Sequence, residues 1–340
     1  MRILLLTRRY AGTDGHSTTM NNVAYALLKR NIDVEIGAFN FIQDPPSGIR
    51  RIRLSYFKDV IGFGKVASKF DIIHNFQGLT NYLARLAHKP FVFHYMGAST
   101  SFQFKNLKLS AMFSRNFISK CLVSSEVSAN DLYTITKLKS VVVSLVVDPA
   151  FYMPIKNSVI KKGEPHILTV TRMMDYKRND ELAYAFSKLL KVYPKAYLQI
   201  IGHGPKFDEF REIVSKLGIS ERVDLMGLVR HSDIIPIYAS CDVYVSTSGL
   251  EAYPYPFLEA MALGKPIVAS DLPVHKEIIT ESQAGEFYKS NNSEDMVNKI
   301  IQVYKNQNQY TEQAKIYAKK HSIGNLADTL IPIYQELCKR

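Results

Sequence analysis

The sequence predicts an α/β protein with two doubly wound domains that face a cleft. Short apolar segments with strand character alternate with helical segments along the chain, and this alternation stops once, near residues 148–162, before it restarts. Such alternation is typical of parallel sheets covered by helices. The length agrees with this, because 340 residues exceed one ordinary core and suit two domains of about 150 residues each.

The first half starts with a βαβ pattern. A buried strand at 3–7 leads into a glycine-containing loop at 12–19, a helix at 21–30 and a second strand at 34–38. Further strands are expected at 72–74, 91–95, 120–124 and 141–143. Residues 44–69 show no pattern that favours one structure.

Residues 148–162 are predicted to be a linker, since Pro149, Pro154 and Gly163 interrupt any regular element. Strands are then expected at 166–170, 197–201, 223–226, 243–246 and 266–269, with helices at 179–191, 206–217 and 231–239. The resulting division is an N-terminal domain at 1–150, a C-terminal domain at 160–322 and a last helix at 323–340, which we expect to cross back to the first domain. Ligands of doubly wound sheets bind at the carboxyl ends of the strands.

The composition limits the class of protein. No window of about 18 apolar residues is present, so no transmembrane helix is expected. The apolar run at 3–6 is too short for the core of a signal peptide, which favours a cytoplasmic protein. The cysteines Cys121, Cys241 and Cys338 are scattered and suggest neither a disulfide framework nor a metal site.

Positive charge is concentrated in the first half. The net charge is +12; residues 1–150 hold 19 Lys and Arg against 9 Asp and Glu, a balance of +10, and residues 151–340 hold 24 against 22, a balance of +2. A basic surface attracts anionic partners such as nucleic acid, phosphorylated ligands or an anionic membrane. A solvated basic surface that aids solubility is the alternative.

Two glutamates, Glu251 and Glu259, follow the expected strand at 243–246. Pro254 and Pro256 keep the loop out of a helix, which can then begin near Pro256 and end at Gly264. Glu259 would lie in its first turn. The N–H groups at a helix start can bind phosphate, and carboxylates at its rim can accept hydrogen bonds from sugar hydroxyls. Alternatively, both residues are solvated glutamates that favour a helix N-terminus.

Arg172 and Lys177 lie five positions apart after the expected strand at 166–170. Two cations on such a loop can bracket a diphosphate, but they can equally be surface cations. Two glycine segments also follow strands, at 12–19 and at 202–205. Glycine there lets the backbone approach a ligand closely, although the second segment can be just a tight turn.

The order of these segments resembles the retaining glycosyltransferases of the GT-B fold in glycosyltransferase family 4, the glycosyl transferases group 1. TRMMDYKRND (171–180) is similar to the family's Arg-x4-Lys segment, and IIGHGP (200–205) to its Gly-x-Gly-Pro turn. SGLEAYPYPFLEAMALGKPIVASD (248–271) resembles its Glu-x7-Glu segment. The resemblance covers nearly the whole chain and is strongest from His166 to Ile279.

The resemblance implies that the second domain holds a nucleotide-diphospho-sugar. Arg172 and Lys177 would bind the diphosphate, Glu251 the donor sugar and Glu259 the ribose hydroxyls. The other donor-binding positions would be Gly15, whose amide would face the diphosphate from the first domain; Leu228 and Val229, where the base usually packs; and Tyr253 and Tyr255, through backbone amides.

Three positions depart from the family pattern. Asp14 replaces the first glycine of a glycine pair, and Ala252 stands where glycine is common. The third departure is Met96, which occupies the slot of the family histidine. His94, two residues earlier, faces the same way on a strand; it is a catalytic candidate, with a structural histidine as the alternative.

The expected activity is retaining transfer of a hexosyl unit without a metal, since no Asp-x-Asp segment is present and the two cations can stabilise the departing diphosphate. No cofactor beyond the donor substrate is expected. Residues 102–120 mix Phe102, Phe104 and Phe113 with basic residues and suit a membrane surface, or else form an ordinary packed helix. The acceptor would be a glycan or a lipid-linked sugar.

Other classes stay open at this point. The acceptor can be small and soluble, or the chain can bind a nucleotide-sugar without transferring it, given Met96 and Asp14. A sugar epimerase of the same fold is disfavoured by the Glu-x7-Glu segment. No module for recognising nucleic acid is visible, so no nucleic-acid partner is expected.

Overall fold

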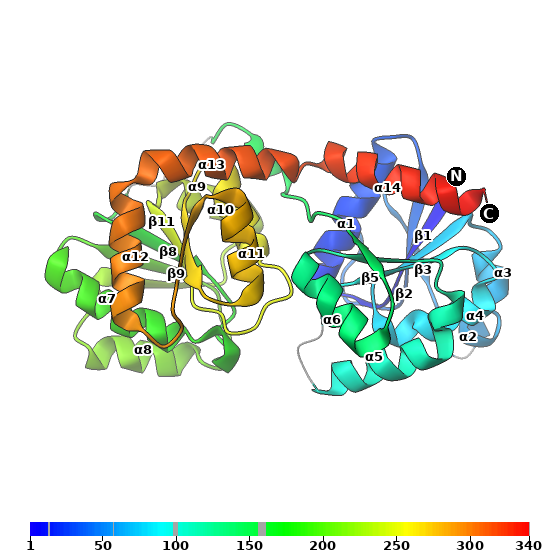
Figure 1. Cartoon of the computed structure of the whole chain (residues 1–340), viewed down its shortest axis with the longest axis horizontal. Helices are drawn as coiled ribbons and strands as arrows, with labels where there is room; N and C mark the ends of the chain where they lie inside the picture. Colours follow the sequence, from blue (N-terminus) through cyan, green and yellow to red (C-terminus); the bar gives the residue numbers. More distant parts are fainter. Residues whose placement is uncertain (13, 57, 98–100, 156–160, 340) are drawn as a thin grey trace. The chain divides into compact units, whose positions relative to one another are not determined.

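The chain forms two units, each built on its own parallel sheet (Figure 1). The computed structural model describes residues 1–12, 14–56, 58–97, 101–155 and 161–339, without the side chains of 101–104 and 231–232. Unit 1 comprises Met1–Val146 and His321–Arg340, and unit 2 comprises Val147–Lys320. Residues 156–160 of the predicted linker lie outside the described residues.

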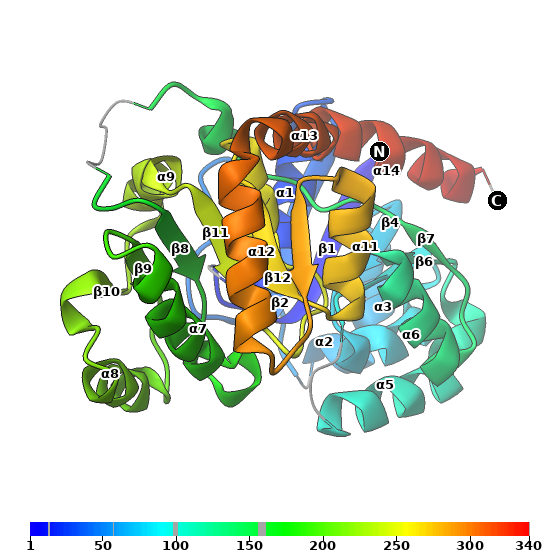
Figure 2. The same ribbon diagram turned by 60° about the vertical axis from the view of Figure 1, so that its left-hand side comes forward.

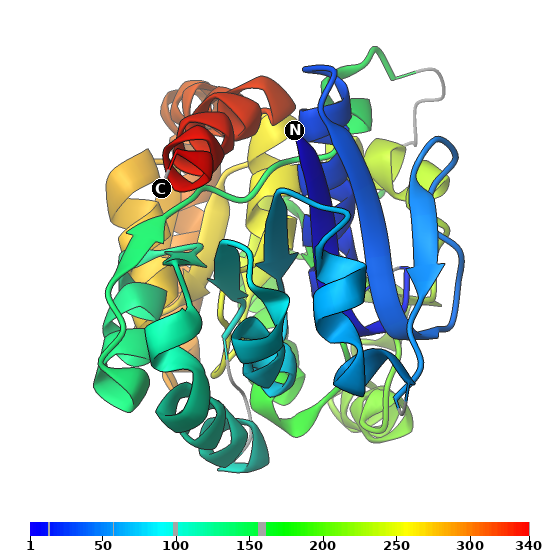
Figure 3. The ribbon, with the colours of Figure 1, turned by 90° about the vertical axis from the view of Figure 1, so that its right-hand side faces the viewer.

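Unit 1 contains a seven-stranded sheet in the order β3-β2-β1-β4-β5-β6-β7, in which neighbouring strands run parallel. Its strands are β1 (Arg2–Tyr10), β2 (Asp33–Phe41), β3 (Arg50–Arg53), β4 (Ile72–Asn75), β5 (Phe91–Tyr95), β6 (Lys120–Val123) and β7 (Ser140–Val142). Figure 3 shows β1 and β2, both blue, side by side. The strand order reverses direction between β1 and β4, which is where ligands bind in doubly wound sheets.

Helices cover both faces of this sheet because side chains of a strand alternate between its faces. Ile3 and Leu5 of β1 share a core with α1 (Gly15–Leu28) and α14 (Ile323–Cys338). Leu4 and Leu6 share another with α3 (Phe63–Ala67) and α4 (Ala84–Ala87). The remaining helices of unit 1 are α2 (Lys58–Ile61), α5 (Ser101–Ser114) and α6 (Glu126–Thr136).

The last helix, α14, is part of unit 1 and packs against α1 (Figure 1). Ser322 caps its start by accepting a hydrogen bond from the Asn325 N–H at 3.3 Å. Leu330 and Tyr334 are fully buried, and the Tyr334 hydroxyl lies 2.6 Å from His74 Nδ1. The helix therefore completes the core over the middle of the sheet.

Unit 2 contains a six-stranded parallel sheet in the order β10-β9-β8-β11-β12-β13. Its strands are β8 (His166–Val170), β9 (Tyr197–Ile201), β10 (Val223–Gly227), β11 (Val243–Ser246), β12 (Ile267–Ser270) and β13 (Gly285–Tyr288). Its helices are α7 (Asn179–Val192), α8 (Phe207–Lys216), α9 (His231–Ser240), α10 (Tyr255–Ala262), α11 (Pro273–Ser282), α12 (Ser293–Lys305) and α13 (Gln307–Lys320).

Strand β11 shows how this sheet is covered. Val243 and Val245 belong to the core that includes α7, α8 and α12, and α12, orange, lies across the sheet in Figure 2. Tyr244 points to the opposite face, where its ring packs on Tyr238 of α9 and Phe257 of α10. The strand order reverses between β8 and β11. Ligands of such sheets bind at the carboxyl ends of the strands near this point, and we call this side of each sheet its ligand edge.

Several predicted boundaries differ from the structure. The predicted loop at 12–19 is largely helical, because Asp14 caps α1 and the helix begins at Gly15. Helix α10 begins at Tyr255, so Glu259 lies in its second turn rather than its first. The strands β3 and β13 lie in segments for which no strand was predicted.

No helix among the described residues combines the length and the apolar character needed to cross a membrane.

Candidate functional site

The loops after β8 and β11 form one connected surface at the ligand edge of unit 2. The Gly249 N–H donates to the Tyr176 carbonyl at 2.7 Å, and the Thr247 hydroxyl donates to the Lys177 carbonyl at 2.7 Å. These bonds fix the two loops to each other. Arg172, Lys177 and Glu251, which sequence spacing singled out, all belong to them.

Lys177 and Glu251 form an ion pair across the two loops. The Lys177 and Glu251 side chains are 14% and 19% exposed, so the pair is mostly buried but still accessible to a ligand. The Lys177 ammonium also lies 5.6 Å from the centre of the Tyr176 ring. The structure thus places a cation suited to a phosphate beside a carboxylate suited to sugar hydroxyls.

Arg172 lies on a loop segment that two backbone hydrogen bonds attach to the end of β9 and the turn after it. The Thr171 N–H donates to the Ile201 carbonyl at 2.9 Å, and the Met173 N–H donates to the His203 carbonyl at 3.2 Å. Gly202 has a φ of +136°, and a Cβ on it would lie 1.7 Å from the Thr171 carbonyl oxygen. The glycine turn after β9 is therefore needed for this close approach.

The Arg172 side chain is exposed, and among the described residues it has no hydrogen-bond or ion-pair partner. Asp175 on the same loop pairs with Lys206 at 2.9 Å instead. The loop thus presents a guanidinium whose N–H groups can donate hydrogen bonds to an incoming anion.

Arg178 is a residue of this site that sequence spacing did not identify. Its backbone is left-handed, with φ 45°, and its guanidinium donates to the Thr247 carbonyl at 3.2 Å and to the Ser290 hydroxyl at 3.1 Å. It follows Lys177 directly, but only the structure shows that it binds the protein's own loops. Arg178 therefore positions the loop that carries Lys177.

Glu259 is held by a buried tyrosine. The Tyr238 hydroxyl donates to Glu259 Oε2 at 2.8 Å. Burial raises the pKa of Tyr238 well above its usual value, with a further contribution from the charge of Glu259, so the phenol stays a donor. This contact fixes the carboxylate at the second turn of α10, and nothing in the sequence pattern pointed to Tyr238.

The other predicted donor residues of unit 2 occupy varied surroundings. Leu228 is 84% exposed directly after β10, although an apolar residue would ordinarily be part of the core; Val229 is half-buried. The Tyr253 hydroxyl lies 3.4 Å from that of Tyr317 on α13, so this side chain points towards that helix. Tyr255 is the first residue of α10.

In unit 1, Gly15 is the exposed first residue of α1. Asp14, which departs from the family pattern, has a local role: its Oδ1 accepts a hydrogen bond from the Ser17 N–H at 2.8 Å. Aspartate is a preferred residue at this position because it satisfies an otherwise unpaired helical N–H.

His94 and Met96 lie at different depths. His94 is 1% exposed, stacks on His74 and Phe76, and among the described residues neither ring nitrogen has a hydrogen-bond partner. Burial, with a smaller contribution from the charge of nearby His16, lowers the pKa of His94 to about 3. A neutral, enclosed imidazole favours the structural alternative, whereas Met96 lines an open pocket.

Among the residues that the structure describes, no three His, Cys, Asp or Glu side chains gather in a way that could hold a metal ion.

Residues 154–321 match the protein family described as glycosyl transferases group 1. An uncharacterized glycosyltransferase of Haemophilus influenzae is 29% identical over 196 residues, which are 56% of this chain and 55% of that protein. The alpha-monoglucosyldiacylglycerol synthase of Streptococcus pneumoniae is 26% identical over 161 residues, 46% of this chain and 36% of that protein. The chain thus matches about half or less of the length of these relatives.

Solved structures share the fold over almost the whole chain. HepE from Anabaena, crystallised with UDP, has a TM-score of 0.83 at 18% identity and covers 99% of this chain and 100% of its own. WaaG, a glycosyltransferase of lipopolysaccharide biosynthesis, has a TM-score of 0.76 at 16% identity, covering 98% and 99%. The chain has the GT-B fold, and the family match over unit 2 supports a GT-B glycosyltransferase.

Proposed function

We propose that the protein is a retaining glycosyltransferase that moves a hexosyl unit from a nucleotide-diphospho-sugar to an acceptor hydroxyl. One observation carries the proposal: the exposed Arg172 and the Lys177–Glu251 pair share one connected surface at the ligand edge of unit 2. This surface lies within the residues that match the glycosyl transferases group 1.

In this proposal each charged group has one role. Arg172 and Lys177 take up the charge of the departing diphosphate, which is electrostatic stabilisation of the leaving group. Glu251, beside Lys177, accepts hydrogen bonds from the donor sugar, and Glu259 from the ribose. Leu228 and Val229 would lie beside the base. HepE has been crystallised with UDP and with UDP-glucose, which makes a uridine donor the first to test.

The two cations would also replace a metal. A divalent ion placed between Arg172 and Lys177 would be repelled by both, and each can neutralise a phosphate oxygen directly. We therefore propose that transfer survives excess EDTA with at most a severalfold loss. Complete loss of transfer under EDTA, restored by manganese or magnesium, would assign the charge to a metal.

The acceptor is proposed to be a glycan or a lipid-linked sugar, with unit 1 resting on an anionic membrane from the cytoplasmic side. Helix α5 buries Leu107 against the sheet and also buries Ala111, but it exposes Leu109, Met112 and Phe113. Lys105 and Lys108 on the same helix are also exposed. Apolar groups flanked by lysines suit an anionic membrane surface. The named activity of the pneumococcal relative, which concerns a diacylglycerol lipid, supports a lipid-linked acceptor.

A soluble acceptor is the second possibility within the same reaction. One relative, the N-acetyl-alpha-D-glucosaminyl L-malate synthase of Bacillus anthracis, is 24% identical over 148 residues, 44% of this chain and 38% of that protein. Its name indicates a small acceptor. Transfer to soluble acceptors without vesicles would favour this version.

Acceptor-dependent release of nucleoside diphosphate tests the proposed activity. The full chain is incubated with UDP-glucose and other nucleotide-sugars, with and without a mixture of glycan and lipid-linked acceptors. We expect release to rise with acceptor and to fall roughly ten- to a hundredfold in Arg172→Ala, through the loss of a charge-assisted contact. If the protein binds UDP but releases no nucleoside diphosphate from any donor, it is a binding protein. The buried His94, and Met96 at the position of the family histidine, would explain that result.

A further inference from the structure

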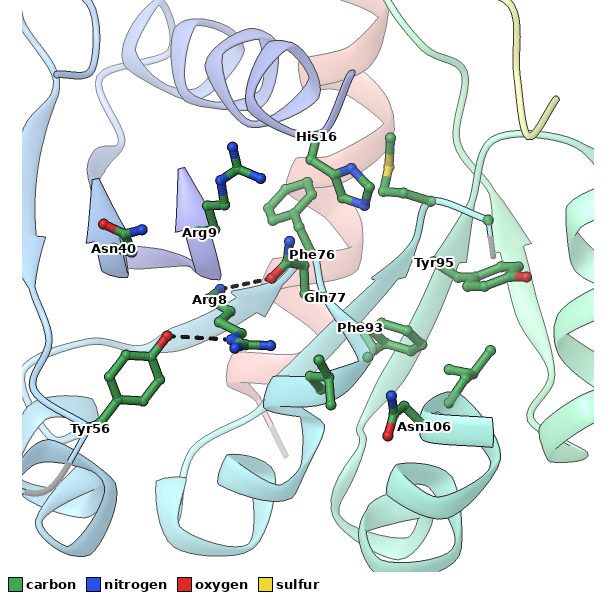
Figure 4. A pocket seen from close by; sticks show the side chains of 15 residues that line it. Arg8, Arg9, His16, Asn40, Tyr56, Phe76, Gln77, Phe93, Tyr95 and Asn106 are labelled. Atoms are coloured by element: carbon green, nitrogen blue, oxygen red, sulfur yellow. Dashed lines mark hydrogen bonds between the residues drawn. The ribbon is translucent and has the colours of Figure 1, made fainter. Parts of the chain in front are cut away.

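Unit 1 has a pocket of its own at the ligand edge of its sheet, with a volume of about 410 Å³. It opens where the strand order reverses, between the ends of β1 and β4. Figure 4 shows its labelled side chains, with Arg8, Arg9 and Tyr56 on one side and Phe93, Tyr95 and Asn106 on the other. None of the residues described above as donor-binding lines it.

The charge of the lining is one-sided. Arg8 and Arg9 both line the pocket and both are exposed, and no aspartate or glutamate is among the lining residues. The Arg8 Nε donates to the Tyr56 hydroxyl at 3.3 Å, and the Arg9 side chain has no partner among the described residues. The guanidinium of arginine forms strong hydrogen bonds to carboxylates and phosphates, so a cavity lined by two arginines and no acid is suited to a bound anion.

Other donors point to the same ligand chemistry. Asn106 Nδ2 is buried at the pocket wall and, within the described chain, lacks a hydrogen-bond partner. An unpaired buried donor is costly unless a ligand or water satisfies it. Half-buried His16, near the start of α1, also lines the pocket.

A network of hydrogen bonds holds the loop beside the arginines. The Gln77 Oε1 accepts a hydrogen bond from the Arg8 N–H at 3.1 Å, and the Gln77 carbonyl accepts from Asn75 Nδ2 at 2.8 Å. Asn75 in turn is bonded to Thr80 at 2.6 Å and to Asn81 at 2.7 Å, and all three are buried. Such a network fixes the pocket before a ligand arrives, which lowers the entropic cost of binding.

The opposite wall is apolar apart from Asn106. Phe93 and Tyr95 of β5, Met96 after it and Leu107 of α5 form this side. An apolar wall with a few polar groups at one end is typical of sites for ligands with two chemically different ends.

We propose that this pocket binds the acceptor through a negatively charged group, a phosphate or a carboxylate, held by Arg8 and Arg9, while the rest of the acceptor packs on Phe93, Tyr95 and Leu107. The inference rests on the proposed function, because it names the chemical class of the acceptor. The anionic group can belong to a soluble sugar acid or sugar phosphate, or to a lipid headgroup.

Calorimetry on the full chain tests the pocket. The probes are glucose 6-phosphate, glucuronic acid and dihexanoyl phosphatidylglycerol below its micelle concentration, with glucose as the neutral reference. We expect the anionic probes to bind at least about tenfold more tightly than glucose and to lose that advantage in Arg8→Gln/Arg9→Gln, because charge-assisted hydrogen bonds are lost. Tighter binding of the lipid than of either anionic sugar would assign the group to a headgroup, and the reverse would assign it to a soluble acceptor.

The control variant is Lys65→Ala/Lys69→Ala, which removes the same charge from exposed positions of unit 1 that do not line the pocket. It should bind the probes like the wild type. Equal affinity for glucose and for every anionic probe, or unchanged affinity in Arg8→Gln/Arg9→Gln, would overturn the proposal. If the double variant does not fold, Arg9→Gln alone serves, since that side chain has no partner to lose within the described chain.

UDP binding, measured in parallel, separates this inference from the proposed function. Arg8→Gln/Arg9→Gln should keep the UDP affinity of the wild type, and Arg172→Ala should keep the affinity for the anionic probes. UDP binding without probe binding would defeat the acceptor site alone. Probe binding without UDP binding would support the pocket and defeat the donor assignment.

Discussion

Lys177 and Arg178 are adjacent cations with different partners. Lys177 pairs with Glu251 on the neighbouring loop, whereas Arg178 donates to the carbonyl of Thr247 and to Ser290. Spacing alone could single out Lys177 and Glu251, because both follow strands that end at the same edge of one sheet. It could not separate Lys177 from Arg178 or find Tyr238, because those assignments depend on contacts between side chains far apart in the sequence.

The ion pair makes the effects of Lys177 and Glu251 interdependent. Lys177→Ala removes the proposed phosphate partner and also leaves Glu251 without its lysine, beside the expected diphosphate. We expect this variant to bind UDP roughly ten- to a hundredfold more weakly, and Lys177→Ala/Glu251→Gln to recover part of the loss, because the unpaired carboxylate no longer repels the phosphates. Glu251→Gln alone should keep or raise UDP affinity while it lowers turnover.

Calorimetry with UDP and a turnover assay measure these effects. Lys188→Ala is the matched control, because its ammonium pairs with exposed Glu294 at 3.3 Å away from the site. UDP affinity that is no better in Lys177→Ala/Glu251→Gln than in Lys177→Ala would show that Glu251 does not face the phosphates.

At the scale of elements, the sequence predicts the interior strands and the edge strands β7 and β10, but it does not predict β3 and β13, which lie at the other two edges. The strands at 91–95, 166–170, 197–201 and 243–246 were predicted with their exact bounds, because each is a short apolar run between polar turns. β3 contains Arg50, Arg51 and Arg53 and lies at an edge, so no apolar pattern marks it. The apolar spacing predicts a helix from residue 21, but α1 begins at Gly15, because Asp14 caps it there.

The glycine turn after β9 gives a prediction about the Arg172 loop. In Gly202→Ala the new Cβ would meet the Thr171 carbonyl oxygen, so the loop must move. We expect UDP affinity to fall on the order of ten- to a hundredfold, since a displaced Arg172 would lose its proposed charge-assisted contact with the diphosphate. Calorimetry measures it.

Gly218→Ala provides the comparison, because Gly218 also has a positive φ, +67°, but a Cβ there meets nothing within 4 Å. It should lose about 1–2 kcal/mol of stability through backbone strain and keep its UDP affinity. Equal UDP affinities in the two alanine variants would show that the glycine turn at Gly202 does not position Arg172 for UDP binding.

Helix α5 gives a second prediction at this scale. Met112 and Phe113 are 67% and 54% exposed, and Met112→Ser/Phe113→Ser should reduce binding to anionic vesicles by at least about tenfold, since each buried apolar side chain contributes roughly 1.5–3 kcal/mol. Co-sedimentation measures this. Val192→Ser/Ile316→Ser, from unit 2, removes side chains of similar exposure, 60% and 53%, and should bind like the wild type. Equal losses in both variants would indicate nonspecific adsorption.

At the scale of the whole molecule, the excess of positive charge lies in the part of the sequence that forms unit 1. The balance of +10 in residues 1–150 against +2 in the rest was visible in the sequence, as was the presence of two sheets. The pocket of unit 1 was not visible, because Arg8, Tyr56, Gln77 and Asn106 come from four separate segments. Only the packing of the unit brings them together.

Buried histidines in both units predict how the stability of the molecule depends on pH. His94 in unit 1 and His275 in unit 2 are fully buried, and burial lowers the pKa of each to about 3. In the unfolded chain both would titrate near the ordinary value of about 6.5. Between pH 6.5 and 3 the unfolded state therefore binds more protons, so stability is complete above pH 6.5 and is lost as the pH falls.

Replacing one of these histidines should flatten that dependence. His94→Phe keeps the stacking on His74 and Phe76 and sacrifices no hydrogen bond of the described structure. Denaturant unfolding at pH 7.5 and 5.0 should show that the wild type loses on the order of 1–2 kcal/mol more than this variant. Exposed His203 supplies the control, because His203→Gln should lose as much as the wild type. A wild-type loss no larger than that of His94→Phe would mean that His94 becomes protonated in the folded protein, and it would return His94 to the candidates for proton transfer.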